Sequence, residues 1–112
     1  MALMRNLIRD DVIRELTWTG RQILGEEAAR LGLVTGLSDN PHDTAMALAK
    51  DIAAKSPTAI RASKRLLNRA PDSDQHDILQ METEEQLILM GSANQREALQ
   101  AHTEKRNPIF VD

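Results

Sequence analysis

Residues 87–110 read LILMGSANQREALQAHTEKRNPIF, and this stretch decides the fold class. It opens with four consecutive apolar residues, Leu87 to Met90, which would go round a helix completely, so the end of that helix needs cover on every side. Gly91 breaks the pattern, and Ser92 followed by Gln95 three residues later is a capping box that begins a new helix. The stretch therefore predicts two helices joined by a tight turn.

Upstream of this stretch, three segments have the spacing of amphipathic helices. Asn40-Pro41 is the clearest boundary in the chain, since asparagine caps a helix and proline suits its first turn. A helix follows to about Lys55 and stops there because Pro57 disfavours helical geometry at the residue before it. A second helix is interrupted by residues 70–74, and a third runs from about Ser73 to Met90.

Two shorter helices are predicted before residue 38. The first spans Asp10–Thr17 and is ended by Gly20, and the second stops at Gly32. Residues 21–24 are expected to be a short strand or an extended piece, and residues 33–37 an apolar connector that forms a brief strand.

The end of the last helix is predicted near Arg106, because Pro108 prevents much continuation. The fold class predicted for the whole chain is mainly α, with about five to six helices and at most one or two short strands.

Composition limits the function. The chain has 112 residues, a formal charge of -3 and only 2% aromatic residues, so we expect one thin core and no global field for nucleic acid or an anionic membrane. It has no cysteine, which excludes disulfides and thiolate metal sites and fits a cytoplasmic location. No apolar run approaches the roughly 20 residues of a membrane span.

The usual catalytic and metal-binding patterns are not found. His42, His76 and His102 have no partners at helical spacing, so no metal site is expected. Adjacent glutamates, such as Glu26 with Glu27, diverge by about 100° on a helix and do not form an acid/base pair. No serine lies in a nucleophile elbow.

Charge is distributed unevenly along the middle of the chain. Residues 52–71 carry five cations and no acid, whereas residues 72–86 carry six acids and no lysine or arginine. One interpretation is a basic face for RNA or phosphate. The other, which we favour, is two adjacent solvated faces that attract each other, because the aromatic residues that stack on bases are missing.

Three long segments resemble, in order, one protein family. They are ELTWTGRQILGEEAARLGLV (15–34), ALAKDIAAKSPTAIRASKRLLN (47–68) and the final METEEQLILMGSANQREALQAHTEKRNPIF (81–110). Together they resemble the C-terminal portion of the crotonase (enoyl-CoA hydratase/isomerase) superfamily. The resemblance implies that residues 1–37 are the end of the core domain and that residues 38–112 are a helical oligomerisation domain, which builds trimers or hexamers.

The resemblance also implies a chemistry and a partner. Members of the family hydrate or isomerise acyl-CoA thioesters, as in fatty-acid β-oxidation, and need no further cofactor. Their catalytic glutamates and oxyanion hole lie in a region N-terminal to the matching segments, so no catalytic residue is assigned to these 112 residues. The chain alone is expected to be inactive; the alternative is a non-catalytic, self-associating helical module.

Two binding residues follow from the same resemblance. Lys105 matches the lysine that reaches a CoA phosphate in the family, although a helix C-terminus favours a cation in any case. His102 stands where many relatives have a phenylalanine against CoA. Asn94, where aspartate is usual, and Ala98, where glycine is usual, depart from the family pattern.

Overall fold

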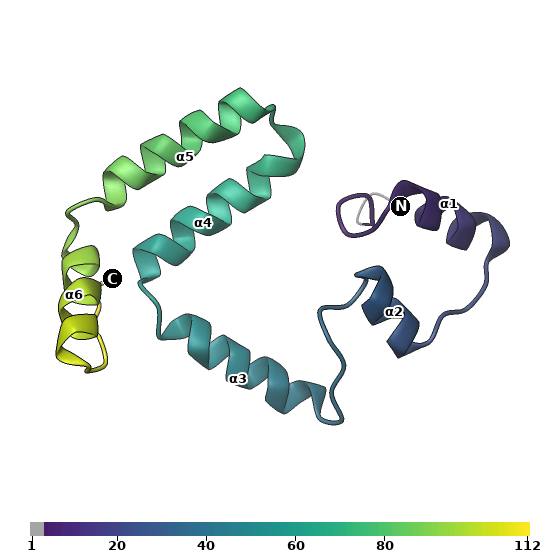
Figure 1. Cartoon of the computed structure of the whole chain (residues 1–112), viewed down its shortest axis with the longest axis horizontal. Coiled ribbons are helices and arrows are strands. Elements are labelled where there is room, and N and C mark those ends of the chain that lie inside the picture. The colour runs from purple at the N-terminus through teal and green to yellow at the C-terminus, as the bar shows by residue number, and fades with distance from the viewer. Residues whose placement is uncertain (1–3) are drawn as a thin grey trace. The chain divides into compact units, whose positions relative to one another are not determined.

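The computed structural model describes residues 4–112 and shows a helical protein (Figure 1). These residues contain six α-helices and one 3-10 turn, and no β-strand, so the mainly α prediction is confirmed. The two segments expected to be strands, 21–24 and 33–37, are connectors, because no extended segment pairs with either of them in the described chain. The helices are α1 (Asp10–Thr19), α2 (Gly25–Leu31), α3 (Pro41–Ala53), α4 (Pro57–Arg69), α5 (Gln75–Leu89) and α6 (Ala93–Glu104), with the 3-10 turn at Ala70–Asp72.

The chain divides into two compact units, one up to Ala45 and one from Met46 onwards. The boundary falls within α3, and each unit is described by itself. The assignment of residues 1–37 to a core domain and of 38–112 to an oligomerisation domain stays a prediction.

The first unit holds α1 and α2 together through one arginine. Gly20 ends α1 in the left-handed conformation, with φ of 62°, as its position predicted. Arg21 then donates to Glu15 at 2.6 and 3.0 Å and to Glu27 at 2.8 and 3.0 Å. These bonds raise the pKa of Arg21 and lower that of Glu27. The residue expected to begin a strand is therefore an ionic link between two helices.

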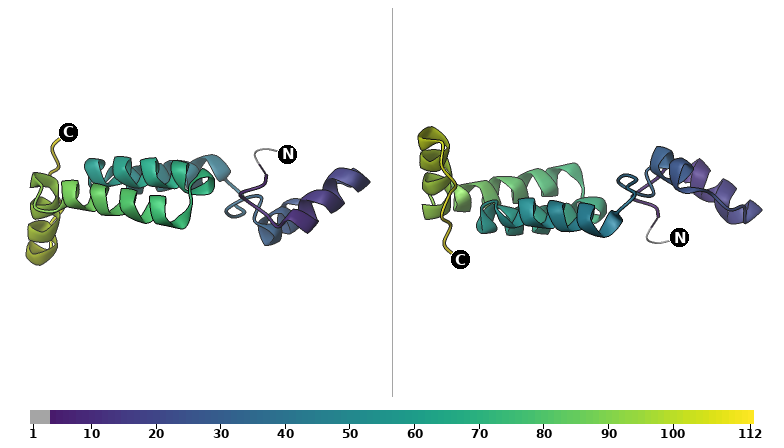
Figure 2. Two further views of the ribbon diagram at one scale, coloured as in Figure 1. Left: turned by 90° about the horizontal axis from the view of Figure 1, so that it is seen from above. Right: turned by 90° about the horizontal axis from the view of Figure 1, so that it is seen from below.

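The second unit contains a helical hairpin made of α4, the 3-10 turn and α5, whose helices lie side by side (Figures 1 and 2). Ser56 precedes α4 with ψ of 116°, the extended geometry that Pro57 imposes. Asp74 caps α5 by accepting from the Asp77 N–H at 2.9 Å. The turn that joins the two helices of the hairpin therefore lies within residues 70–74, where an interruption was predicted.

Opposite charges hold the hairpin together on its surface. The Arg65 guanidinium donates to both carboxylate oxygens of Glu85, at 2.6 and 2.7 Å. This pair raises the pKa of Arg65 and lowers the pKa of Glu85. For this pair the expected attraction between the basic and acidic segments is confirmed.

Little of the described chain is buried. Leu87, Ile88 and Met90, which were expected to need cover on every side, are 65%, 72% and 60% exposed, so residues 4–112 do not supply that cover. Within each unit, the described helices have apolar faces that remain largely exposed. The buried residues are Ile8, Ile13, Ala62, Asn94 and Ala101.

Helix α6 begins as predicted and ends two residues early. The Ser92 hydroxyl accepts from the Gln95 N–H at 3.2 Å, and Gln95 accepts in return from the Gly91 N–H. The helix ends because Lys105 is left-handed, which lets the Arg106 N–H donate to the Ala101 carbonyl at 3.0 Å. A local motif, rather than Pro108, therefore ends α6.

Candidate ligand-binding site

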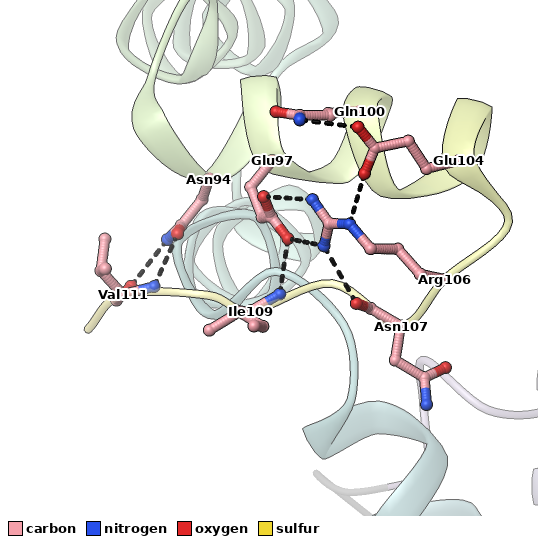
Figure 3. A network of polar contacts seen from close by, with 8 residues as sticks. All are labelled: Asn94, Glu97, Gln100, Glu104, Arg106, Asn107, Ile109 and Val111. Carbon is pink, nitrogen blue, oxygen red and sulfur yellow. Dashed lines mark hydrogen bonds and ion pairs between the residues drawn. The ribbon is translucent and has the colours of Figure 1, made fainter.

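The last six residues, 107–112, run back along α6, and we call them the C-terminal strap (Figure 3). The Asn94 side chain pairs with the main chain of Val111 in both directions. It donates to the Val111 carbonyl at 2.8 Å and accepts from the Val111 N–H at 2.9 Å. Asn94 also donates to the Thr58 hydroxyl of α4 at 3.4 Å and is only 3% exposed. A buried amide therefore joins the strap, α6 and α4.

One turn further along α6, Glu97 binds the strap at a second point. Its carboxylate accepts from the Ile109 N–H at 2.7 Å and from two guanidinium nitrogens of Arg106 (Figure 3). The Arg106 ion pair, and then the Ile109 N–H, lower the pKa of Glu97 to about 2. The carboxylate is thus ionised across the neutral range.

Arg106 links this carboxylate to the end of α6. Its Nε donates to Glu104 at 2.6 Å, and Glu104 also accepts from Gln100 at 2.8 Å. Both glutamates raise the pKa of Arg106, and the pKa of Glu104 is lowered. The guanidinium also donates to the Asn107 carbonyl at 3.1 Å, so it fixes the point where the strap leaves the helix.

The strap forms part of the lining of an open cavity of about 490 Å³ in the second unit. Two strap side chains, Pro108 and Phe110, are half-buried there. The cavity combines three basic side chains with apolar ones, a mixture that suits a ligand with both anionic and apolar parts. Its lining consists of Asp51, Ala54, Lys55, Ser56, Ala98, Ala101, His102, Arg106, Asn107, Pro108 and Phe110.

The two binding residues expected from the sequence are placed differently. His102 is exposed and contributes to the cavity lining, whereas Lys105 is exposed and lies outside that lining. The structure also brings in Lys55, which had been counted only as one of the five cations; its ammonium pairs with Asp51 at 2.8 Å.

Lys105 has an unusual backbone. Its φ of 53° makes it the single non-glycine residue with positive φ among residues 4–112. A left-handed backbone costs an L-residue about 1–2 kcal/mol, and glycine would adopt it without that strain. Lys105 thus adopts a strained backbone conformation of the kind that is concentrated at functional sites.

Asn94 and Glu97 were not identified as site residues from the sequence, where Asn94 was only a departure from a family pattern. Their spacing of three residues places them on one face of a helix, and this is the signal that could have found them. The adjacent glutamates dismissed as catalytic pairs have structural partners: Arg21 for Glu27 and Arg65 for Glu85. No group of three potential metal ligands occurs within residues 4–112.

The described part of the chain also contains no helix with the length and hydropathy of a membrane span.

Comparison with known proteins identifies the family. The model of the enoyl-CoA hydratase/isomerase family matches residues 2–112, nearly the whole chain. The chain belongs to the enoyl-CoA hydratase/isomerase family.

Individual relatives agree with this assignment. A probable mitochondrial enoyl-CoA hydratase 2 of Arabidopsis thaliana is 30% identical over 110 residues, which are 96% of this chain and 36% of that protein. A mitochondrial Delta(3,5)-Delta(2,4)-dienoyl-CoA isomerase of Dictyostelium discoideum is 34% identical over 101 residues, 87% of this chain and 34% of that protein. The crystal structure of enoyl-CoA hydratase from Bacillus anthracis superposes with a TM-score of 0.88 at 32% identity, and covers 96% of this chain and 42% of its own.

The chain thus spans a little over a third of the curated relatives that it matches, and about two-fifths of the solved structure. The fold of the family is shared over almost all of these 112 residues.

Proposed function

We propose that this chain is the C-terminal portion of an enoyl-CoA hydratase/isomerase and that it supplies part of a coenzyme A site together with oligomer contacts. The observation that carries the proposal is the cavity of about 490 Å³ in the second unit, with His102 in its lining. Phe110, Pro108 and three alanines give the apolar surface that a pantetheine chain needs. The two cations of the lining already have carboxylate partners, Asp51 for Lys55 and both Glu97 and Glu104 for Arg106, so the phosphate contact is proposed for another residue.

Lys105 is proposed to contact a phosphate of CoA. An ammonium on a flexible stem is a mobile point charge, so it can reach a phosphate that lies outside the cavity lining. The strained backbone at this residue supports the role, because a glycine would satisfy the helix end equally well.

The Lys105 role is tested by calorimetric titration of the 112-residue chain with CoA and with 3′-dephospho-CoA. We expect Lys105→Gly to weaken CoA binding at least fivefold while raising stability by up to about 1 kcal/mol, because the strain at a positive φ is removed. Lys64→Ala, which removes an exposed cation of α4 outside the cavity lining, is the matched control and should change affinity less than twofold.

The two ligands locate the phosphate. If Lys105 contacts the 3′-phosphate, Lys105→Gly should weaken CoA binding more than 3′-dephospho-CoA binding; if it contacts the pyrophosphate, both should weaken equally. Equal affinities for CoA in the wild type and in Lys105→Gly would refute the role of Lys105. No binding of CoA by the wild-type chain at millimolar concentration would refute the site.

Catalysis by the isolated chain is not part of this proposal. The resemblance places the catalytic glutamates in a region without a counterpart in these residues. We expect the purified 112-residue chain to give no measurable hydration of a short 2-enoyl-CoA. The assay monitors the absorbance of the enoyl thioester, which hydration would remove. Measurable turnover would contradict this.

Self-association is the second proposed function, and it could also operate without CoA. The chain exposes 9186 Å², whereas two compact units of these sizes would expose roughly 7,400 Å². The excess is about twice the roughly 800 Å² that each partner buries in a typical stable interface. Large apolar residues that are more than half exposed on the hairpin and α6 are Leu67, Leu79, Leu87, Ile88 and Leu99.

Light scattering at micromolar concentration tests the self-association. We expect an oligomer, trimer or hexamer as in the family, and we expect Leu67→Glu to raise its dissociation constant at least tenfold, because the leucine is 71% exposed. Asn68→Glu adds the same charge at the next residue of α4, which is also exposed, and should change it less than twofold. A stable wild-type monomer would contradict this function.

The proposal includes a cytoplasmic location and no nucleic-acid or membrane partner. The absence of cysteine and the charge of -3 support these points. RNA binding by residues 55–69 is the weaker alternative, and an oligonucleotide that is not retarded at low salt would remove it.

A further inference from the structure

We infer that hydrogen bonds to its main chain anchor the C-terminal strap on α6, and that Asn94 and Glu97 are positioning residues that keep Pro108 and Phe110 in the wall of the cavity. The identity of the ligand rests on the proposed function, but the mechanism of the strap does not.

The strap uses alternate residues for two different purposes. Ile109 and Val111 are bound through their backbone groups, and their side chains are 79% and 61% exposed. Pro108, which precedes Ile109, and Phe110, which lies between Ile109 and Val111, are half-buried and contribute to the cavity lining. Side chains alternate along an extended chain, so fixing the main chain of one set aims the other set at the cavity.

Two points on α6 bind two points on the strap. Asn94 and Glu97 are separated by about 4.5 Å along the helix axis, and residues 109 and 111 by about 6.6 Å along an extended chain. The two segments run in opposite directions, so that Asn94 meets Val111 and Glu97 meets Ile109 (Figure 3). Two side chains one turn apart therefore replace the neighbouring strand that an extended segment would otherwise need.

The amide at residue 94 makes two bonds of opposite kind. Its NH₂ group donates to the Val111 carbonyl while its oxygen accepts from the Val111 N–H. A carboxylate can do only the second of these, and it would place a negative charge against the carbonyl oxygen. Because Asn94 is 3% exposed, water does not replace the lost bond in the bound strap.

The end of the strap is tied to a second helix. Asp112 forms an ion pair with Arg61 of α4, and Asn94 reaches Thr58 on the same helix. The strap thus connects α6 to the hairpin, and its release would open one wall of the cavity and loosen that connection at the same time.

Two NMR measurements on the full chain test the strap. Amide hydrogen exchange at Ile109 and Val111 reports the main-chain attachment. The aromatic signals of Phe110 report the cavity wall without ambiguity, because the chain has a single phenylalanine and no tyrosine. We expect Asn94→Ala and Asn94→Asp to accelerate exchange at Val111 at least tenfold and to move the Phe110 signals toward those of a free peptide.

A pair of glutamate variants supplies the matched control. Glu97→Gln keeps an acceptor for the Ile109 N–H but loses the charge that holds Arg106, so exchange at Ile109 should rise at least threefold. Glu104→Gln also removes a partner of Arg106 but has no bond to the strap, so exchange at Ile109 should stay within twofold of wild type.

The same variants separate this inference from the proposed function. With the strap released, CoA affinity should fall at least fivefold in both Asn94 variants, while Glu104→Gln keeps its affinity. If CoA does not bind the wild type but exchange and the Phe110 signals change as expected, the strap stands and the CoA site fails. Unchanged exchange at Val111 in both Asn94 variants, or Phe110 signals that do not move, would overturn the inference.

Discussion

The hairpin of α4 and α5 and the assembly of α6 with its strap lie in the same unit but are held together by opposite means. The hairpin keeps large apolar residues at its surface, with Leu67 71% and Ile88 72% exposed, and one bidentate ion pair joins its helices. The strap leaves the side chains of Ile109 and Val111 exposed, and its main chain binds Asn94 and Glu97. The polar residue Asn94 is buried in this unit, whereas the large apolar residues of the hairpin are exposed.

The difference shows which surfaces are complete within the chain. The strap finds main-chain partners within the same chain, in the side chains of Asn94, Glu97 and Arg106. The hairpin has apolar faces without cover, so its leucines contribute little to the stability of the chain alone. Their stabilising effect would appear only when another surface covers them.

The largest expected effect in a test of this comparison comes from a pair of alanine substitutions. Asn94→Ala should lower the free energy of unfolding by about 1–3 kcal/mol, because the bonds between the buried Asn94 amide and the main chain of Val111 are lost. Leu67→Ala should change it by no more than about 0.5 kcal/mol, since the leucine is exposed. Urea unfolding at micromolar concentration, followed by circular dichroism, measures both.

Replacing a buried leucine by alanine usually lowers the free energy of unfolding more than replacing an asparagine does, so the expected order here is the reverse of the usual one. A Leu67→Ala loss larger than the Asn94→Ala loss would show that the hairpin face is covered in solution. Repeating the titration over a tenfold range of protein concentration separates cover by a second copy from packing within the chain, because only the former depends on concentration.

The second test compares the helix caps of the two regions. Ser92 caps α6 and is half-buried, whereas Asp74 caps α5 and is exposed. Replacing a capping side chain by alanine costs about 0.5–2 kcal/mol. We expect Ser92→Ala to lie in the upper half of this range and Asp74→Ala in the lower half, because water can replace the lost bond only at the exposed cap. Thermal unfolding of the two variants checks the order, and a larger loss for Asp74→Ala would contradict it.

Much of the helical architecture could be predicted from local sequence. Gly20, Gly32, Ser56-Pro57 and Ser92 each end or begin a helix as expected, because capping depends on a few neighbouring residues. No strand forms at 21–24, which were expected to be a short strand or an extended piece, or at 33–37, since a strand depends on a partner that sequence pattern does not supply.

The candidate site was harder to predict, because it depends on where the chain goes after α6. Pro108 signalled that the helix must stop, but the return of the strap follows from the left-handed turn at Lys105. Lysine is not a usual residue for that turn, so pattern alone extended the helix to Arg106. Once the strap is in place, the role of Asn94 follows from its distance to Val111, which no local pattern encodes.

The smallest expected effect is the response of the strap to a fall in pH. Arg106 and the Ile109 N–H lower the pKa of Glu97 to about 2, from an ordinary value near 4.5. The folded-state pKa is below the unfolded one, so this stabilisation is complete above about pH 4.5 and is lost as the pH falls toward 2. The Phe110 signals should therefore stay constant from pH 7 to about 4.5 and change below it.

The hairpin pair provides the comparison for this titration. Arg65 alone lowers the pKa of Glu85, whereas Glu97 has both a guanidinium and a backbone donor. Arg65–Glu85 should consequently be released at a higher pH than the strap, and added salt should weaken it more, because Arg65 is 56% exposed and Arg106 is 35% exposed. Carboxylate chemical shifts of the two glutamates, followed from pH 7 to 2 at low and high salt, measure both. A Glu97 that titrates at or above the pH of Glu85 would show that the Ile109 N–H contributes nothing to holding the strap.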